Sequence, residues 1–206
     1  IHGGLCHSQN IESIFGHTPG LKVALPSTAA DAKGLLATAI RSEDPVLFLE
    51  HKALYRAASA QTPTPPEDYT LPFGEARIAR EGSDLTIVTY GMMVPKALNT
   101  AKELEKEGVD VEVVDLRTIV PLDSKTVLDS IKKTNRALVV YEDHEFIGFG
   151  AELSAQIGDE AFKYLDAPIR RVAGDFTPIP FAHSLERAVL PSDEGILEAA
   201  RDLAAF

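Results

Sequence analysis

The stretch Leu85-Thr86-Ile87-Val88-Thr89-Tyr90-Gly91, followed by Val111-Glu112-Val113-Val114, decides the fold class of this chain. The first run is almost wholly apolar or β-branched, which is typical of a strand covered on both faces. Between the two runs, apolar residues recur with helical spacing, and Gly108 is suited to end that helix. We therefore predict a strand–helix–strand unit with parallel strands and a right-handed crossover.

The same alternation continues to the C-terminus and predicts a complete α/β domain over residues 73–206. A helix is expected to begin at Asp123, and another after Gly148-Phe149-Gly150. Ser192 is expected to cap a closing helix. Two more apolar runs are predicted to be strands, at 137–141 and 169–172.

Residues 1–56 have the same character but too few strands for a sheet of their own. We predict a helix that Ser8 caps, strands at 21–25 and 46–49, and a helix over 32–40. Since two strands make a poor sheet, this part is interpreted as half of a doubly wound domain. Residues 57–72, which are rich in proline, are predicted to be a linker.

The bulk composition excludes some partners. The chain has 206 residues, with 20 Lys and Arg against 31 Asp and Glu, so its formal net charge is −11. Such a charge disfavours binding to nucleic acid or to acidic membranes. The single Cys6 favours a reducing compartment, either a bacterial-type cytoplasm or a mitochondrial matrix. The sequence does not open with Met, which suggests part of a longer protein.

His7 is the first candidate for chemistry. It follows Gly3 and Gly4, which permit a tight loop with positive φ. We expect it at a loop-to-helix junction, where an imidazole can face a cleft. From the local sequence, a solvated or capping histidine and an acid–base group both remain open.

Nine motifs, taken in order, carry a family resemblance over essentially the whole chain. They resemble the β subunits of thiamine-diphosphate-dependent 2-oxo acid dehydrogenases, which act on pyruvate, branched-chain 2-oxo acids or acetoin. The motifs are His7-Ser8-Gln9, Phe15-Gly16-His17, Pro19-Gly20-Leu21-Lys22-Val23, Asp31-Ala32-Lys33-Gly34-Leu35-Leu36, Asp44-Pro45-Val46, Leu54-Tyr55-Arg56, Asp115-Leu116-Arg117-Thr118, Gly148-Phe149-Gly150-Ala151-Glu152 and Thr177-Pro178-Ile179-Pro180.

The resemblance implies a transketolase-like fold, with half of a pyrimidine-binding domain followed by a C-terminal three-layer domain. It implies thiamine diphosphate with Mg²⁺, held through a motif on an α subunit, and a ring-contacting glutamate in an N-terminal part of the β subunit. Its reaction is decarboxylation of a 2-oxo acid and acyl transfer to the lipoyl group of a partner acyltransferase. His7 resembles an acid–base residue, and a second β subunit is a further implied partner.

The resemblance also implies a monovalent cation such as K⁺, bound by the carbonyls of Ala39 and Ile40 and by Asp44. Carbonyl groups at a helix C-terminus carry partial negative charge, which suits such an ion. Glu142-Asp143-His144-Glu145 could be read as a metal cluster, but adjacent residues seldom ligate one ion. A solvated loop or a subunit contact is favoured there, and His51 and His183 are interpreted as structural.

Two other functions remain open. A transketolase-type enzyme needs basic residues for sugar phosphates, and this acidic sequence offers no such cluster. A dimerisation module without chemistry would suit the isolated chain, which is expected to be inactive. The acyl group is also open, although residues 2–7 and 54–56 lean towards a branched-chain or broad-range bacterial type.

Overall fold

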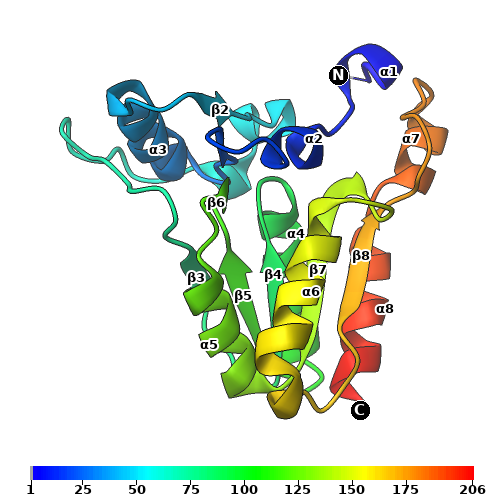
Figure 1. Cartoon of the computed structure of the whole chain (residues 1–206). Coiled ribbons are helices and arrows are strands. Elements are labelled where there is room, and N and C mark those ends of the chain that lie inside the picture. Colours follow the sequence, from blue (N-terminus) through cyan, green and yellow to red (C-terminus); the bar gives the residue numbers. More distant parts are fainter. Residues whose placement is uncertain (1) are drawn as a thin grey trace.

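The computed structural model describes residues 2–206 as a small N-terminal part seated on a larger α/β body (Figure 1). The N-terminal part contains α1 (Gly4–His7), α2 (Glu12–Gly16), β1 (Lys22–Ala24), α3 (Ala29–Arg41), β2 (Val46–Phe48) and two 3-10 helices, η1 (Lys52–Arg56) and η2 (Ala58–Ala60). The body contains β3 (Arg77–Arg80), β4 (Leu85–Thr89), α4 (Met93–Glu105), β5 (Val111–Asp115), β6 (Thr118–Val120), α5 (Ser124–Thr134), β7 (Ala137–His144), α6 (Phe149–Ala161), η3 (Phe162–Tyr164), β8 (Arg170–Gly174), α7 (His183–Val189) and α8 (Asp193–Ala204).

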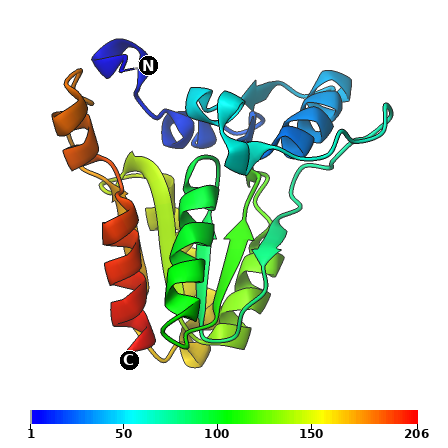
Figure 2. The same cartoon turned by 180° about the vertical axis from the view of Figure 1, so that it is seen from behind.

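The body is a three-layer domain around a five-stranded sheet of order β3-β5-β4-β7-β8. Strands β5, β4, β7 and β8 are parallel, and β3 joins the edge of β5 in the antiparallel direction. One apolar core lies between the sheet and α5 and α6, and a second lies between the sheet and α4 and α8. Figure 2 shows the α4 and α8 face. The predicted α/β class and the strand–helix–strand unit are confirmed.

The sheet of the N-terminal part includes one strand from the body. Strands β1 and β2 are parallel and joined through α3, as the sequence predicts. Residues 118–120, which we did not predict to be a strand, form β6 and pair with β1 in the antiparallel direction. The resulting sheet has the order β2-β1-β6, and this third strand makes a sheet of what would otherwise be a strand pair.

Buried charges also join the two parts. Asp31 on α3 and Asp115 at the end of β5 are both buried. Arg77 lies 2.9 Å from the Asp115 carboxylate and 3.5 Å from that of Asp31, and Arg117 lies 2.9 Å from Asp31. Ser27 donates a hydrogen bond to Asp115. Because each buried carboxylate has a cationic partner, this cluster fixes α3 against the body.

The sequence analysis missed the short elements α1, η1 and η2 as well as β3, β6 and α7, and one expected helix is different. β3 is a half-buried edge strand flanked by arginines, β6 has three residues, and α7 has no buried residue. The expected helix capped by Ser8 is wrong: Ser8 ends α1, and α2 begins only at Glu12, without a side-chain cap. No helix within residues 2–206 combines the length and apolarity needed to cross a bilayer.

Candidate functional site

His7 lies at the C-terminal end of the single-turn helix α1 and is exposed. The expected loop-to-helix junction is therefore wrong, because the Ser8 hydroxyl accepts a hydrogen bond from the Gly3 amide at 3.1 Å instead of capping a following helix. Gly3 is required at its position, since a Cβ there would collide with the Cβ of His7. The Gly3–Ser8 hydrogen bond thus closes the turn, and the turn presents the His7 imidazole to solvent.

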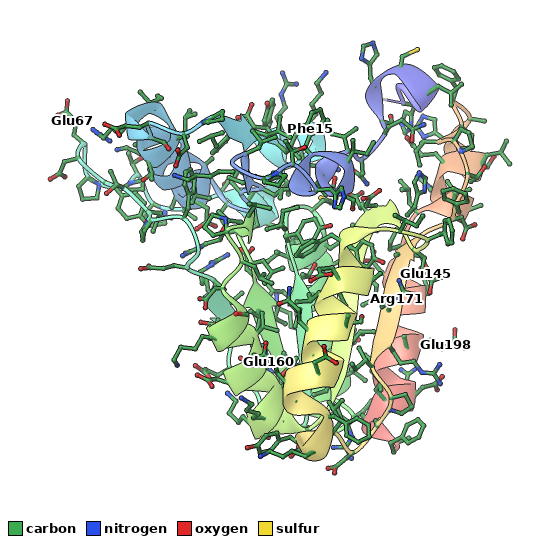
Figure 3. All side chains as sticks on the ribbon, in the orientation of Figure 1. Phe15, Glu67, Glu145, Glu160, Arg171 and Glu198 are labelled. Carbon is green, nitrogen blue, oxygen red and sulfur yellow. The ribbon has the colours of Figure 1, made fainter. Side chains whose placement is uncertain are left out.

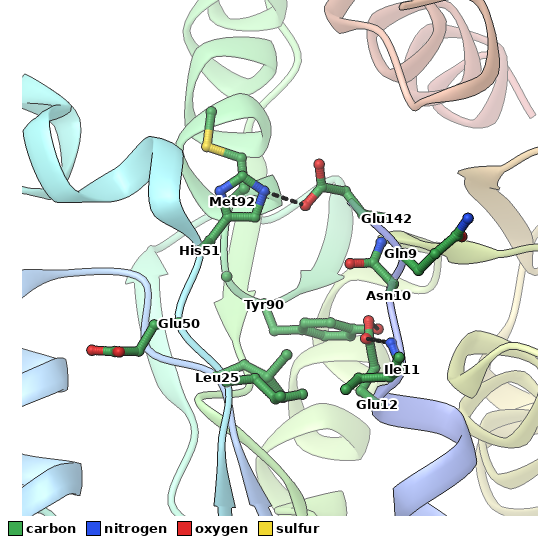
Figure 4. A pocket seen from close by; sticks show the side chains of 12 residues that line it. Gln9, Asn10, Ile11, Glu12, Leu25, Glu50, His51, Tyr90, Met92 and Glu142 are labelled. Atoms are coloured by element: carbon green, nitrogen blue, oxygen red, sulfur yellow. Dashed lines mark hydrogen bonds and ion pairs between the residues drawn. The ribbon is translucent and has the colours of Figure 1, made fainter. Parts of the chain in front are cut away.

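A cavity of about 150 Å³ opens where the N-terminal part meets the body, just after this turn (Figure 4). Its wall comes from residues 9–12, from Leu25, from the segment after β2, from the β4–α4 turn and from β7. The lining residues are Gln9, Asn10, Ile11, Glu12, Leu25, Leu49, Glu50, His51, Tyr90, Gly91, Met92 and Glu142. His7 does not line it, although Gln9 and Asn10 do.

Glu12 is the buried acid of this cavity, with only 3% of its surface exposed. Its carboxylate accepts hydrogen bonds from the Tyr90 hydroxyl at 3.0 Å and from the Ile11 amide at 3.1 Å. Burial, followed by the charge of Asp143, raises the pKa of Glu12 from 4.5 to about 7. A carboxyl group with such a pKa can hold or release a proton near neutral pH.

His51 faces Glu142 across the same cavity, with 3.0 Å between Nε2 and the carboxylate oxygen. Burial alone would lower the pKa of His51, but the hydrogen bond and the charge of Glu142 outweigh it and raise that pKa above 6.5. Nδ1 of His51 accepts from the Ala53 amide at 3.3 Å, which fixes the ring. In Figure 4, Glu50 points away from this pair, and its carboxylate accepts from Tyr55.

The run from Glu142 to Glu145 does not converge on one point. Asp143 accepts a hydrogen bond from Ser13, His144 contacts the carbonyl of Asp175 at 2.7 Å, and Glu145 pairs with Arg171 at 3.4 Å (Figure 3). Across residues 2–206, no group of three His, Cys, Asp or Glu side chains is placed to hold a metal ion.

The residues of the predicted potassium site already have other partners. The carbonyl of Ala39 accepts from the Ser42 amide at 3.1 Å, and the Ile40 side chain is 77% exposed. The Asp44 carboxylate lies 2.9 Å from the ammonium of Lys22. The Lys22 ammonium thus occupies the place beside Asp44 that a bound cation would take. The cation site stays a prediction.

Sequence reasoning missed the cavity. Ile11, Ile14 and Phe15 have the spacing of an apolar helix face, yet Ile14 is 70% exposed and Glu12 is buried instead. Tyr90, the partner of Glu12, lies 78 positions away, so no local pattern joins the two. We interpret His51 as structural from the sequence, which does not reveal its ion pair with Glu142 on β7.

Comparison with known proteins gives two family matches. The family described as "Transketolase, pyrimidine binding domain" matches residues 2–58, and "Transketolase, C-terminal domain" matches residues 74–196.

Curated relatives cover nearly all of this chain. The 2-oxoisovalerate dehydrogenase subunit beta of Bacillus subtilis is 45% identical over 100% of the chain and 63% of that protein. The pyruvate dehydrogenase E1 component subunit beta of Rickettsia felis is 48% identical over 95% of the chain and 59% of its own length, and that of Bacillus subtilis is 47% identical over 100% and 62%. The chain thus spans about three fifths of these relatives.

Two solved structures share the fold. A split-gene transketolase, described as an inactive beta4 tetramer, superposes with a TM-score of 0.76 at 24% identity, over 96% of this chain and 62% of the other. A transketolase mutant from Pichia stipitis gives 0.65 at 16% identity, over 98% and 28%. At these identities the likeness concerns the fold alone.

Proposed function

Since this chain belongs to the transketolase family, with its pyrimidine-binding and C-terminal domains, we propose that it acts as the β subunit of a thiamine-diphosphate-dependent 2-oxo acid dehydrogenase. The observation that carries the proposal is the identity of 45–48% to β subunits of pyruvate and 2-oxoisovalerate dehydrogenases along nearly the whole chain. The transketolases are far less similar in sequence, so sugar-phosphate chemistry is not favoured.

The proposed reaction is oxidative decarboxylation of a 2-oxo acid with transfer of the acyl group to lipoyl. As the lipoyl disulfide opens, one sulfur takes the acyl group and the other becomes a thiolate that needs a proton. His7 is the group that we assign to this proton transfer, because its side chain is exposed and an imidazole can act as a general acid or base. Its exposure on α1 leaves it accessible to a large acceptor such as a lipoyl domain.

The residues described do not fit thiamine diphosphate by themselves. The described residues that line the cavity include no Lys or Arg, and its one histidine, His51, is already paired with Glu142, so a diphosphate would find no free cationic partner there. Residues 2–206 also lack a three-residue metal-binding group for Mg²⁺. We therefore assign no step to the cofactor within this chain and propose that an α subunit holds its diphosphate and Mg²⁺.

The remaining partners follow from the same proposal. We assign the contact with a second β subunit to residues 73–206. A lipoyl-bearing acyltransferase is the partner that accepts the acyl group. The exposed free thiol of Cys6 supports a reducing compartment, the bacterial-type cytoplasm or the mitochondrial matrix. The chain by itself is assigned no activity.

A substrate panel tests the proposed function. The subunit carrying this chain is assembled with its α subunit, thiamine diphosphate and Mg²⁺, and acylation of a lipoyl domain is followed by mass. Pyruvate or a branched-chain 2-oxo acid should acylate the domain. Ketol transfer from a sugar phosphate, with no acylation by any 2-oxo acid, would overturn the assignment and favour a transketolase.

A further inference from the structure

The turn that contains α1 and carries His7 lies against residues 181–186 at the start of α7, far from it in sequence. Nδ1 of His2 contacts the carboxylate of Glu186, and the rings of His2 and His183 lie with centroids 3.2 Å apart. The side chain of Glu186 is 12% exposed and that of His2 is 36% exposed, so the contact lies at the surface with its carboxylate half partly buried. Figures 1 and 2 both show α1 beside α7.

A second contact lies two residues further along the turn, at Gly4. Gly4 has φ +49°, and a Cβ built on it would fall 2.7 Å from three carbons of the Phe181 ring. The backbone of α1 therefore packs directly on that ring, and the positive φ of Gly4 favours glycine at this position. Phe181 is still 58% exposed, so its ring is not part of an apolar core. Its packing role is to support α1.

The segment that contains α7 is tied to the body. The carbonyl of Val189 accepts from the Asp175 amide at 2.9 Å, which joins the end of α7 to the chain just after β8. Lys96 on α4 donates to the carbonyl of Pro191 at 2.6 Å. Because α7 is held to the body by these hydrogen bonds, the residues that contact α7 are positioned relative to the body as well.

We propose that Glu186 and Phe181 are positioning residues for His7, a role that rests on the proposed function of His7. A helix of four residues is not stable without packing, so Phe181, just before α7, and Glu186, on α7, decide where α1 lies. A displacement of about 1 Å in an acid–base group can cost on the order of 10²-fold in rate. Residues of the C-terminal body therefore set the place of an imidazole in the N-terminal part.

The first test measures the position of α1 without any catalytic assay. Cys6 is the single cysteine of the chain, lies on α1 and is exposed, so it accepts a nitroxide label for electron paramagnetic resonance. The label should be immobilised in the parent protein and shift to the mobile, narrow spectrum in Glu186→Ala and Phe181→Ala. A spectrum that is equally mobile in all three proteins would overturn the proposal.

Matched controls separate this effect from a general loss of charge or of an aromatic ring. Glu198→Ala removes an exposed carboxylate on α8 (Figure 3), and Phe162→Ala removes a 77% exposed ring on η3. Both controls should leave the label immobilised. An equal loosening in the controls would show that α7 has no special part and would count against the proposal.

The second test is a double-mutant cycle in the assembled enzyme, with lipoyl-domain acylation as the readout. Glu186→Ala should lower kcat on the order of 10-fold to 100-fold, with KM for the 2-oxo acid unchanged. In a His7→Ala background the same substitution should have no further effect, because it acts only through His7. An equal loss in both backgrounds would mean a merely structural role.

The outcomes keep this inference apart from the proposed function. If His7→Ala impairs acylation but Glu186→Ala does not, the positioning role fails and the proposed function stands. If His7→Ala leaves acylation unchanged, the assignment of His7 itself fails.

Discussion

The substitution Glu12→Gln tests the buried carboxyl of the interdomain cavity. Glutamine keeps the size of the side chain, and its amide can accept from the Ile11 amide and donate to the Tyr90 oxygen. It removes the ionisable proton, which is the property in question. The carboxyl sits at the first position of α2, where the helix dipole favours a negative charge by about 0.3–1 kcal/mol. The pKa of Glu12 rises because burial outweighs this favourable effect of the helix dipole.

The expected size follows from the pKa of Glu12. Burial and the neighbouring Asp143 raise that pKa from 4.5 to about 7, a difference of about 2.5. At about 1.36 kcal/mol for each pKa unit, this corresponds to roughly 3 kcal/mol. The folded protein keeps the proton up to about pH 7, whereas the unfolded chain loses it near 4.5. Stability therefore falls as the pH rises through this window.

The assay is denaturant unfolding of the parent protein and of Glu12→Gln between about pH 4 and about pH 8. Relative to the parent, the free energy of unfolding of the variant should rise by about 3 kcal/mol across this range. Asp143, Glu142 and His51 are present in both proteins, so most of their contribution to the pH dependence cancels in the difference. Glu160→Gln, an exposed carboxyl on α6 (Figure 3), is the matched control and should give a flat difference.

A constant difference would refute this reasoning about Glu12. If the two curves stay parallel within about 0.5 kcal/mol, Glu12 is ionised in the folded state near its ordinary pKa. Water would then reach the Glu12 carboxylate more freely than its 3% exposure implies.

Three further predictions concern the cofactor, the charge cluster and the cation. Calorimetric titration of the 206-residue chain with thiamine diphosphate and Mg²⁺ should show no micromolar binding, and a clear micromolar signal would contradict a shared site. Arg77→Ala should lower the free energy of unfolding by on the order of 3 kcal/mol because it leaves Asp115 buried without its cation. Arg201→Ala, which breaks an exposed pair with Glu107, should cost about 1 kcal/mol or less, and equal costs would refute the contrast. If K⁺ binds at Ala39, Ile40 and Asp44, it should raise the melting temperature more than a bulky organic cation does. Asp44→Ala should abolish this difference in melting temperature between the two cations. Equal melting temperatures in the parent protein would show that the site does not bind K⁺.

The body was largely predictable from sequence because its strands are buried and its helices are amphipathic. The run from Leu85 to Thr89 is fully buried, as a continuous apolar strand should be. Asp123 and Ser192 cap α5 and α8, as their position before apolar helical repeats indicated. Local periodicity is sufficient wherever an element packs against the sheet along its whole length.

The elements that escaped prediction depend on partners far away in the chain. Strand β6 is defined by pairing with β1, about a hundred positions earlier, and has only three residues. Glu12 is buried through contacts with Tyr90 and the body, which no spacing within residues 8–18 reveals. For His7, the local sequence left two readings open, and only the family resemblance favoured acid–base chemistry.

The most direct test of the central claim is the acylation rate of a lipoyl domain by the assembled enzyme carrying His7→Ala. We expect a loss of about 10²–10⁴-fold with a melting temperature near that of the parent, because an exposed imidazole on a short turn contributes to proton transfer and little to folding. A near-normal rate, with any change confined to stability of about 1 kcal/mol or less, would contradict the account and make His7 a surface histidine.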